Sequence, residues 1–190
     1  KFFVHNVSVF YLSRGTNVPN FPLKTPSTEL NFVDPASIHV LTRAALETFL
    51  TFHYVFFAPK TTEEQDYRYW AWRAAGLKER QGLPVSTEEH RQKLAGEQKK
   101  LDDFHNRLRA NAVFLRLTKK ERTRVLKGEW RLLSWRDIAT DAGFAKLLAE
   151  VMYRHLSGSA HSSSLSVTQI KQSLQRKEQA QLIGASMNTI

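Results

Sequence analysis

Helix-start signatures recur along the chain. In each, a Ser or Thr is followed three residues later by an acid, so that the hydroxyl and the carboxylate can each accept a hydrogen bond from a backbone N–H that the helix leaves free. The pairs are Thr61 with Glu64, Ser86 with Glu89, Thr118 with Glu121, and Ser134 with Asp137. They predict helices over 61–80, 86–111, 118–127 and 134–142, followed in three cases by Gly82, Gly128 and Gly143. Because successive helices must bury their apolar faces against one another, the predicted fold is an all-α helical bundle.

Three further helices are predicted from apolar periodicity and from helix-breaking residues. Asp34 can cap a helix over 35–57, and Pro35 suits the first turn of that helix. Pro59 ends it. Helices over 144–157 and 167–182 flank a stretch rich in Ser and Gly. The first 33 residues contain several prolines and indicate an irregular arm with a short helix or strand. The chain of 190 residues can bury one sizeable core, so the predicted division is an N-terminal arm at 1–33 and one helical domain at 34–190.

The charge of the chain constrains its partners. Lys and Arg number 28 against 18 Asp and Glu, and the net charge of +10 favours polyanions such as nucleic acid or acidic lipid surfaces. The alternative is a charge that serves solubility alone. The most apolar stretch, 38–57, is interrupted by Arg43, Glu47 and His53, so no membrane-spanning helix is predicted and the cytoplasm is the expected compartment. The sequence has no cysteine, which excludes disulfides and thiolate metal sites.

A polar stripe runs along the predicted helix over 35–57. The helix is apolar over most of its surface, with one wide face made by Leu41, Ala45, Phe49, Phe52 and Phe56. His39, Arg43 and Glu47 recur every fourth residue on the remaining narrow face. Charges on such a helix need a partner, because removing them from water costs several kcal/mol. Either Arg43 and Glu47 pair and fix the helix register, or the stripe lines a polar cleft.

A second stretch whose residues could take part in catalysis or binding lies between Leu148 and Ser164. Tyr153, Ser157 and His161 fall at four-residue spacing, with Arg154 beside the first of them. A helix that continued through Gly158 would place all three on one face, whereas a helix broken there would leave His161 in a loop. No nucleophile elbow or neighbouring acid accompanies Ser157, so a hydrolase triad is not indicated, and a hydrogen-bonded core histidine is the alternative. We predict that Arg43 and Glu47 contact Tyr153 or His161, because matching polar stripes can satisfy one another.

Two passages, Leu41-Thr-Arg43-Ala-Ala-Leu46-Glu47 and Tyr153-Arg-His-Leu-Ser157-Gly-Ser-Ala-His161, carry a resemblance. They resemble a bacterial family of uncharacterised all-helical proteins, which has been likened to the HEPN superfamily. Many HEPN proteins are metal-independent ribonucleases of toxin or defence systems, in which an Arg is followed, after four to six intervening residues, by a His, usually at a dimer interface. The resemblance implies Arg154 and His161 as catalytic residues, separated here by six residues with Gly158 among them. It also implies RNA as a partner and a homodimer.

Basic residues cluster between 107 and 127. Those proposed to contact nucleic acid are Arg116, Lys119, Lys120 and Arg124. An ordinary solvated helix face is the alternative. The sequence has no Gly-rich phosphate loop, no zinc-binding His pair and no paired aspartates of a two-metal nuclease, so no metal and no cofactor is expected.

Three functional hypotheses result. The first is a helical module that binds or cleaves RNA through Arg154 and His161, with Arg43 holding a second phosphate oxygen and Glu47 orienting Arg43 or His161. The second is a non-catalytic interaction domain with a structural polar network, whose members are Arg43, Glu47, Tyr153, Ser157 and His161. The third is a small-ligand pocket between helices, lined by Trp70, Trp72 and Tyr153.

Overall fold

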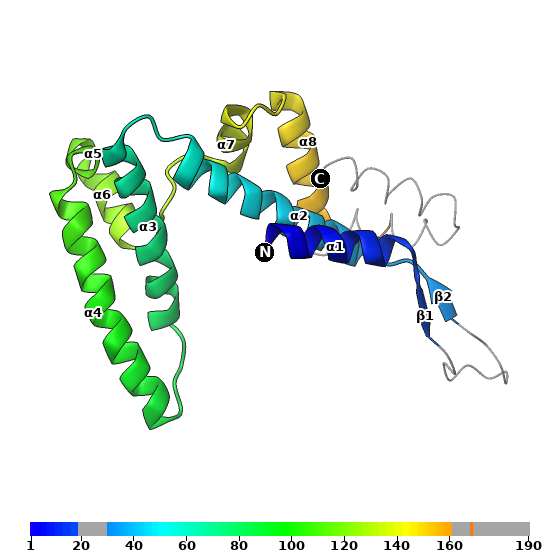
Figure 1. Ribbon diagram of the computed structural model, residues 1–190, viewed down its shortest axis with the longest axis horizontal. Coiled ribbons are helices and arrows are strands. Elements are labelled where there is room, and N and C mark those ends of the chain that lie inside the picture. The colour runs from blue at the N-terminus through cyan, green and yellow to red at the C-terminus, as the bar shows by residue number, and fades with distance from the viewer. Residues whose placement is uncertain (19–29, 161–167, 169–190) are drawn as a thin grey trace. The chain divides into compact units, whose positions relative to one another are not determined.

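The computed structural model describes residues 1–18, 30–160 and 168, and within them the fold is all-α, as predicted (Figure 1). Its elements are α1 (Phe2–Ser13), β1 (Thr16–Val18), β2 (Leu30–Phe32), α2 (Pro35–Phe52), the π-helix η1 (His53–Phe57), α3 (Thr62–Gln81), α4 (Glu88–Ala110), α5 (Ala112–Arg116), α6 (Lys119–Leu126), α7 (Trp135–Asp141) and α8 (Lys146–Ala160). The two short strands pair antiparallel, with Thr16 opposite Phe32. None of the described helices combines the length and the apolar character needed to cross a membrane.

The predicted helix starts are confirmed at three places and displaced by one residue at the fourth. Complete capping boxes open α6 at Thr118 and α7 at Ser134, and the Thr61 hydroxyl accepts from the backbone N–H of Glu64 at the start of α3. At α4 the prediction of Ser86 is wrong, because the cap is Thr87, whose hydroxyl accepts from His90. This start places Glu88 and Glu89 in the first turn, where the helix dipole favours negative charge.

The helix predicted over 35–57 changes character near its end. It is α-helical as far as Phe52 and then forms one π-helical turn, η1, in which the backbone N–H of Ala58 donates to the carbonyl of His53 at 2.9 Å. Pro59 follows and has no N–H with which to continue the ladder. Single π-turns inside helices occur frequently at functional sites.

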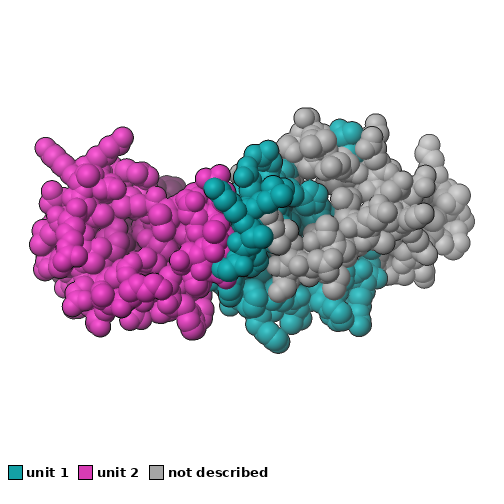
Figure 2. Space-filling view, turned by 90° about the horizontal axis from the view of Figure 1, so that it is seen from above, with its two compact units in different colours: residues 1–50, 143–190 teal, residues 51–142 magenta. Residues whose placement is uncertain are grey.

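The contacts divide the chain into two compact units, one made by residues 1–50 and 143–190 and the other by residues 51–142 (Figure 2). We call them unit 1 and unit 2. Unit 1 is discontinuous in sequence, so its helices α2 and α8 come from distant parts of the chain. Residues 1–33, expected as an arm, contribute α1 and the strand pair to unit 1.

The core of unit 2 lies between α3 and α4, which run side by side in Figure 1. Its buried residues recur at helical spacing and are Tyr67, Ala71, Ala74, Leu101, Phe104, Leu108, Phe114 and Val125. Phe114 of α5 and Val125 of α6 extend the cluster beyond the helix pair. Full burial of a Val, Leu or Phe side chain of this cluster contributes about 1.5–3 kcal/mol, so the cluster stabilises unit 2.

In unit 1, Val9 of α1 packs against Ile38 of α2. The buried residues of α2 include Ile38, Thr42, Ala45, Leu46 and Leu50. The predicted apolar face is therefore only partly correct, since Phe49, Phe52 and Phe56 remain exposed. Small residues at 42 and 45 permit close approach of a neighbouring helix, while Phe52 forms ring contacts within its own segment, at 5.3 Å with Phe56.

Helix α8 is longer than predicted. The prediction ended it at residue 157, but it continues through Gly158 to Ala160. A glycine inside a helix costs about 1 kcal/mol relative to alanine, and burial of a neighbour such as Leu156, which is 1% exposed, can offset that cost. The helix predicted over 167–182 lies, apart from Thr168, outside the described residues.

Candidate functional site

The polar stripe of α2 meets α8 through three side chains. Arg43 Nε donates to Glu47 Oε1 at 2.9 Å, and Arg43 Nη2 donates to the Tyr153 hydroxyl at 3.0 Å. The same hydroxyl donates to Glu47 Oε1 at 3.1 Å, which closes a ring of three hydrogen bonds. The guanidinium carbon also lies 5.1 Å from the centroid of the Tyr153 ring. The predicted contact of Arg43 and Glu47 with Tyr153 is thereby confirmed.

In this network the pKa values of Tyr153 and Arg43 are both shifted further away from neutral pH. Burial raises the pKa of Tyr153, and the adjacent Glu47 charge raises it further. Burial by itself would lower the pKa of Arg43, but the hydrogen bond and charge of Glu47 outweigh it, so the net shift is upward. Tyr153 thus stays neutral and Arg43 stays charged in the physiological range. A general acid or base works best with a pKa near the operating pH, so these two groups suit positioning better than proton transfer.

Other polar groups are buried along α2 and α8. The imidazoles of His39 and His155 meet edge to face, with ring centroids 4.7 Å apart, and His39 is 2% exposed. Thr42 Oγ1, His155 Nε2 and Ser157 Oγ are buried and have no hydrogen-bond partner among the described residues. Ser157, predicted to join the polar network, therefore lies on α8 without a hydrogen bond to Arg43, Glu47 or Tyr153. Such desolvated groups cost about 1–3 kcal/mol each, so this helix contact is not optimised for stability.

Arg154 lies on the exposed side of α8. Its side chain is 82% exposed, and Nη2 donates to Glu150 Oε1 one turn earlier at 3.1 Å. Tyr153, its neighbour in sequence, points instead into the network with Arg43. His161, the predicted partner of Arg154, lies outside the described residues.

The predicted nucleic-acid contacts fall into two groups in unit 2. The side chains of Arg116, Lys119 and Lys120 are exposed and form no hydrogen bond or ion pair within the described part of the chain. Arg124 differs, because its Nε lies 2.6 Å from Glu129 Oε2. The charges of Lys119 and Lys120 are therefore available to an external anion, whereas Arg116 interacts electrostatically with Glu63 and Arg124 is paired with Glu129.

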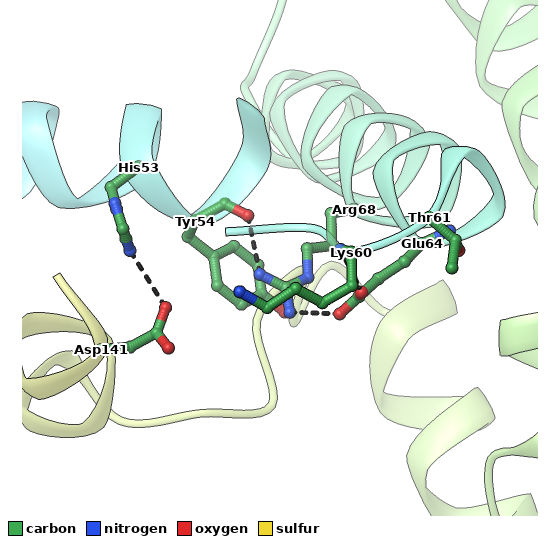
Figure 3. Close-up of polar contacts among 7 residues, drawn as sticks. All are labelled: His53, Tyr54, Lys60, Thr61, Glu64, Arg68 and Asp141. Carbon is green, nitrogen blue, oxygen red and sulfur yellow. Dashed lines mark hydrogen bonds and ion pairs between the residues drawn. The ribbon is translucent and has the colours of Figure 1, made fainter. Parts of the chain in front are cut away.

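A partly buried arginine that the sequence analysis did not single out, Arg68, forms hydrogen bonds near the start of α3 (Figure 3). Arg68 Nη1 donates to the carbonyl of Tyr54 at 2.8 Å, and Nη2 donates to Glu64. Its guanidinium carbon lies 4.1 Å from the Tyr54 ring centroid, and its side chain is only 14% exposed. Glu64 also accepts from the backbone N–H of Lys60 at 2.9 Å. The i,i+4 spacing of Glu64 and Arg68 is visible in the sequence, but the contact with η1 is not.

A second polar contact that sequence reasoning missed joins η1 to α7. His53 Nε2 lies 3.0 Å from Asp141 Oδ2, and the two residues are 88 positions apart (Figure 3). The only sequence signal was a histidine within an otherwise apolar helix. The pair resembles the orienting half of an acid–base dyad, and it links η1 to α7 within unit 2.

The third hypothesis placed Trp70, Trp72 and Tyr153 in one pocket, but each of these side chains has different neighbours. Trp70 packs on Phe104 of the unit 2 core at 5.1 Å, and Tyr153 is engaged with Arg43 and Glu47 in unit 1. Trp72 lines a hollow within unit 2 together with Trp130. Nowhere in the described part of the chain do three His, Asp or Glu side chains gather as a metal site requires.

Comparison with known proteins identifies a family but not an activity. No curated protein and no solved structure matches the chain. One family model does, over residues 29–180, and it spans α2 to α8 with the Arg43, Glu47 and Tyr153 network. Since that match covers most of its length, the chain belongs to this family of unknown function (DUF5677).

Proposed function

We propose that this protein is an RNA-binding helical module, HEPN-like in character, and that its unit 2 contacts the phosphate backbone. The observation that carries the proposal is the adjacent pair of exposed side chains of Lys119 and Lys120, which form no ion pair with an acid among the described residues. Arg116, three residues earlier, is also exposed and interacts electrostatically with Glu63. Unpaired cations of this kind release counterions when they meet phosphates, which is the main source of sequence-independent affinity for RNA. The net charge of +10 acts in the same direction.

Salt-dependent binding tests this proposal. Anisotropy of a labelled single-stranded RNA, measured from about 50 to about 300 mM KCl, should show affinity falling with salt. The double variant Lys119→Gln with Lys120→Gln should weaken binding and reduce the slope of log K against log salt by about 1.4, roughly 0.7 for each lost contact. Arg124→Gln should change the slope less, because Glu129 already neutralises that charge.

A matched control separates a specific surface from general charge. Lys99 and Lys100 form another adjacent exposed pair, on α4, so Lys99→Gln with Lys100→Gln removes the same charge elsewhere. This control should leave most of the affinity intact. Equal losses from the two double variants, or no RNA binding by the unaltered protein, would overturn the proposed surface.

The second candidate function is metal-independent RNA cleavage by Arg154 and His161. Two observations favour it: α8 continues through Gly158 to Ala160, and the Arg154 side chain is 82% exposed. On a helix, positions seven apart fall within about 20° of the same face. In the reaction, His161 would accept the proton of a 2′-OH while the 2′-oxygen forms a bond to phosphorus and the bond to the 5′-oxygen breaks. Arg154 would stabilise the charge on the phosphate, and the leaving 5′-oxygen would take up a proton.

The products distinguish this chemistry from metal-dependent cleavage. In the presence of a chelator the protein should yield 2′,3′-cyclic phosphate and 5′-hydroxyl ends. His161→Ala and Arg154→Gln should each lower the rate at least about a hundredfold, the usual scale for acid–base catalysis. Arg91→Gln is the control, because Arg91 is also exposed and paired with an acid of its own helix, Glu88. Binding without cleavage would leave a non-catalytic interaction domain, the alternative that the closed Arg43, Glu47 and Tyr153 network favours.

A further inference from the structure

A half-open hollow in unit 2 brings two tryptophans together with two lysines. It has a volume of about 600 Å³, within the range of roughly 300–1,000 Å³ typical of ligand pockets. Residues of α3 and of the turn after α6 line it, among them Trp72, Gly76, Lys78, Lys127, Gly128 and Trp130. We infer that this hollow binds a small aromatic anion, a flat ring carrying one acidic group, and the inference is independent of the proposed RNA surface on α5 and α6.

Gly76 leaves the wall of the hollow open on the side of α3. It lies in the interior of α3, where glycine destabilises a helix relative to alanine. Its backbone is ordinary helix, and a Cβ added there would have no heavy atom of the protein within 4 Å. Gly76 forms part of the wall of the hollow, so the absence of a side chain leaves room for a ligand to approach the backbone of α3 closely.

Two indoles indicate an aromatic ligand. Trp72 is held by ring contacts with Phe56 at 6.3 Å and Tyr69 at 6.4 Å, and Trp130 by contacts with Tyr54 at 5.8 Å and Trp135 at 6.0 Å. Both tryptophans are only partly buried and both line the hollow. Aromatic side chains that neighbours already hold in place lose little entropy when a ring packs on them.

The charges of the lining indicate an anion. The side chains of Lys78 and Lys127 form no hydrogen bond or ion pair within the described part of the chain. Glu79 also lines the hollow, so the lining residues include two lysines and one glutamate, with one net positive charge. Gly128, with a φ of +106°, allows the sharp turn after α6, and Lys78 Cγ lies 3.7 Å from where its Cβ would be. The Lys78 stem thus lies against this turn, at the edge of the hollow.

Calorimetric titration of the whole chain with matched probes tests the inference. Indole-3-acetate carries one ring and one carboxylate, indole-3-acetamide is its neutral analogue, and AMP presents the same chemistry as a nucleotide. We expect indole-3-acetate or AMP to bind, and the neutral amide to bind at least about tenfold more weakly than the acetate. Tighter binding of AMP would identify a nucleotide as the source of the aromatic anion, and tighter binding of indole-3-acetate an aromatic acid. Failure of both anions to bind would overturn the inference.

A pair of glycine substitutions makes the test specific to the hollow. Gly76→Ala should raise the melting temperature by about 2 °C through helix propensity and yet weaken ligand binding at least about tenfold, because the methyl group enters the hollow. Gly96→Ala is its match, since Gly96 is an exposed glycine inside α4 whose added Cβ would likewise meet nothing within 4 Å. It should raise the melting temperature similarly and leave the affinity unchanged. Equal affinity for the two variants would overturn the assignment of the site.

Discussion

The Tyr153 hydroxyl donates a hydrogen bond of 3.1 Å to a carboxylate oxygen of Glu47, a residue 106 positions earlier in the chain. The same oxygen accepts from Arg43, so one carboxylate satisfies donors from both α2 and α8. A stripe of charges on an apolar helix is stable only when such partners exist, and here α8 supplies the partner. The bond therefore connects two helices of unit 1 through polar groups.

Replacement of Tyr153 by Phe should lower the free energy of unfolding by about 1–2 kcal/mol, because Arg43 and Glu47 each lose a hydrogen bond in a partly buried site. Thermal unfolding should show a melting temperature lower by about 3–6 °C. Tyr11→Phe is the control, since Tyr11 is 75% exposed, and it should leave stability within about 0.5 kcal/mol. An equal melting temperature for the two variants would contradict the role of the Tyr153 hydroxyl.

Glu47→Ala should destabilise by about 1–2 kcal/mol. This is less than the roughly 3 kcal/mol or more that breaking a fully buried pair costs, because the side chains of Arg43 and Glu47 are 20% and 30% exposed. Combined with Tyr153→Phe in a double-mutant cycle, it should show a coupling energy of at least about 0.5 kcal/mol, measured by denaturant unfolding. Additive losses would mean that Tyr153 and Glu47 do not interact in solution.

Tyr67→Phe should have the opposite sign. Tyr67 is 4% exposed in the core of unit 2, and its hydroxyl is buried without a hydrogen-bond partner among the described residues. Removing an unsatisfied buried hydroxyl relieves a desolvation cost of about 1–3 kcal/mol, offset in part by lost packing. We expect stability unchanged or higher by up to about 1 kcal/mol in urea unfolding. A loss comparable to that of Tyr153→Phe would show that the hydroxyl has a partner.

Stability should fall as the pH rises above 10. Burial raises the pKa of Tyr54, Tyr67 and Tyr153 above the ordinary value of 10.0. Above that value the unfolded chain loses these protons while the folded chain keeps them, so the contribution is fully present below pH 10 and is lost toward the folded-state pKa values. Urea unfolding between about pH 8 and about pH 11 measures the slope. Tyr153→Phe should make the slope shallower, and an unchanged slope would contradict the shift at Tyr153.

Asn111 is the residue that follows α4, and its side-chain amide forms hydrogen bonds with α3 and α5. Its Oδ1 accepts from the backbone N–H groups of Val113 and Phe114 at the start of α5, and its Nδ2 donates to the carbonyl of Glu63 in α3 at 2.9 Å. Asn111→Ala should cost about 1–2 kcal/mol, as loss of an N-cap does. Asn111→Asp keeps the acceptor and loses the donor, so it should cost less in the same thermal unfolding assay. Equal losses would mean that the cap contributes nothing.

The helices of this protein follow from local sequence. Thr118 with Glu121 and Ser134 with Asp137 open α6 and α7 where predicted, because both partners of a capping box lie within three residues of one another. The one-residue error at Thr87 arose because adjacent hydroxyls can both cap. The predicted end of the last described helix at residue 157 was wrong for a different reason: the cost of Gly158 in a helix is small beside the burial of neighbours such as Leu156.

The sites depend on pairs that local patterns do not connect. The stripe of Arg43 and Glu47 was visible at four-residue spacing, and its need for a partner pointed toward Tyr153, so this contact could be predicted. The contact of His53 with Asp141 could not, because its residues lie 88 positions apart and no pattern in sequence couples them. The hollow beside Gly76 needed the turn at Gly128 to lie against α3. Hydrogen bonds within one helical turn are determined by neighbouring residues in the sequence. Burial and long-range pairs arise only when distant segments pack, and for that reason only the tertiary structure decided that His53 contacts Asp141.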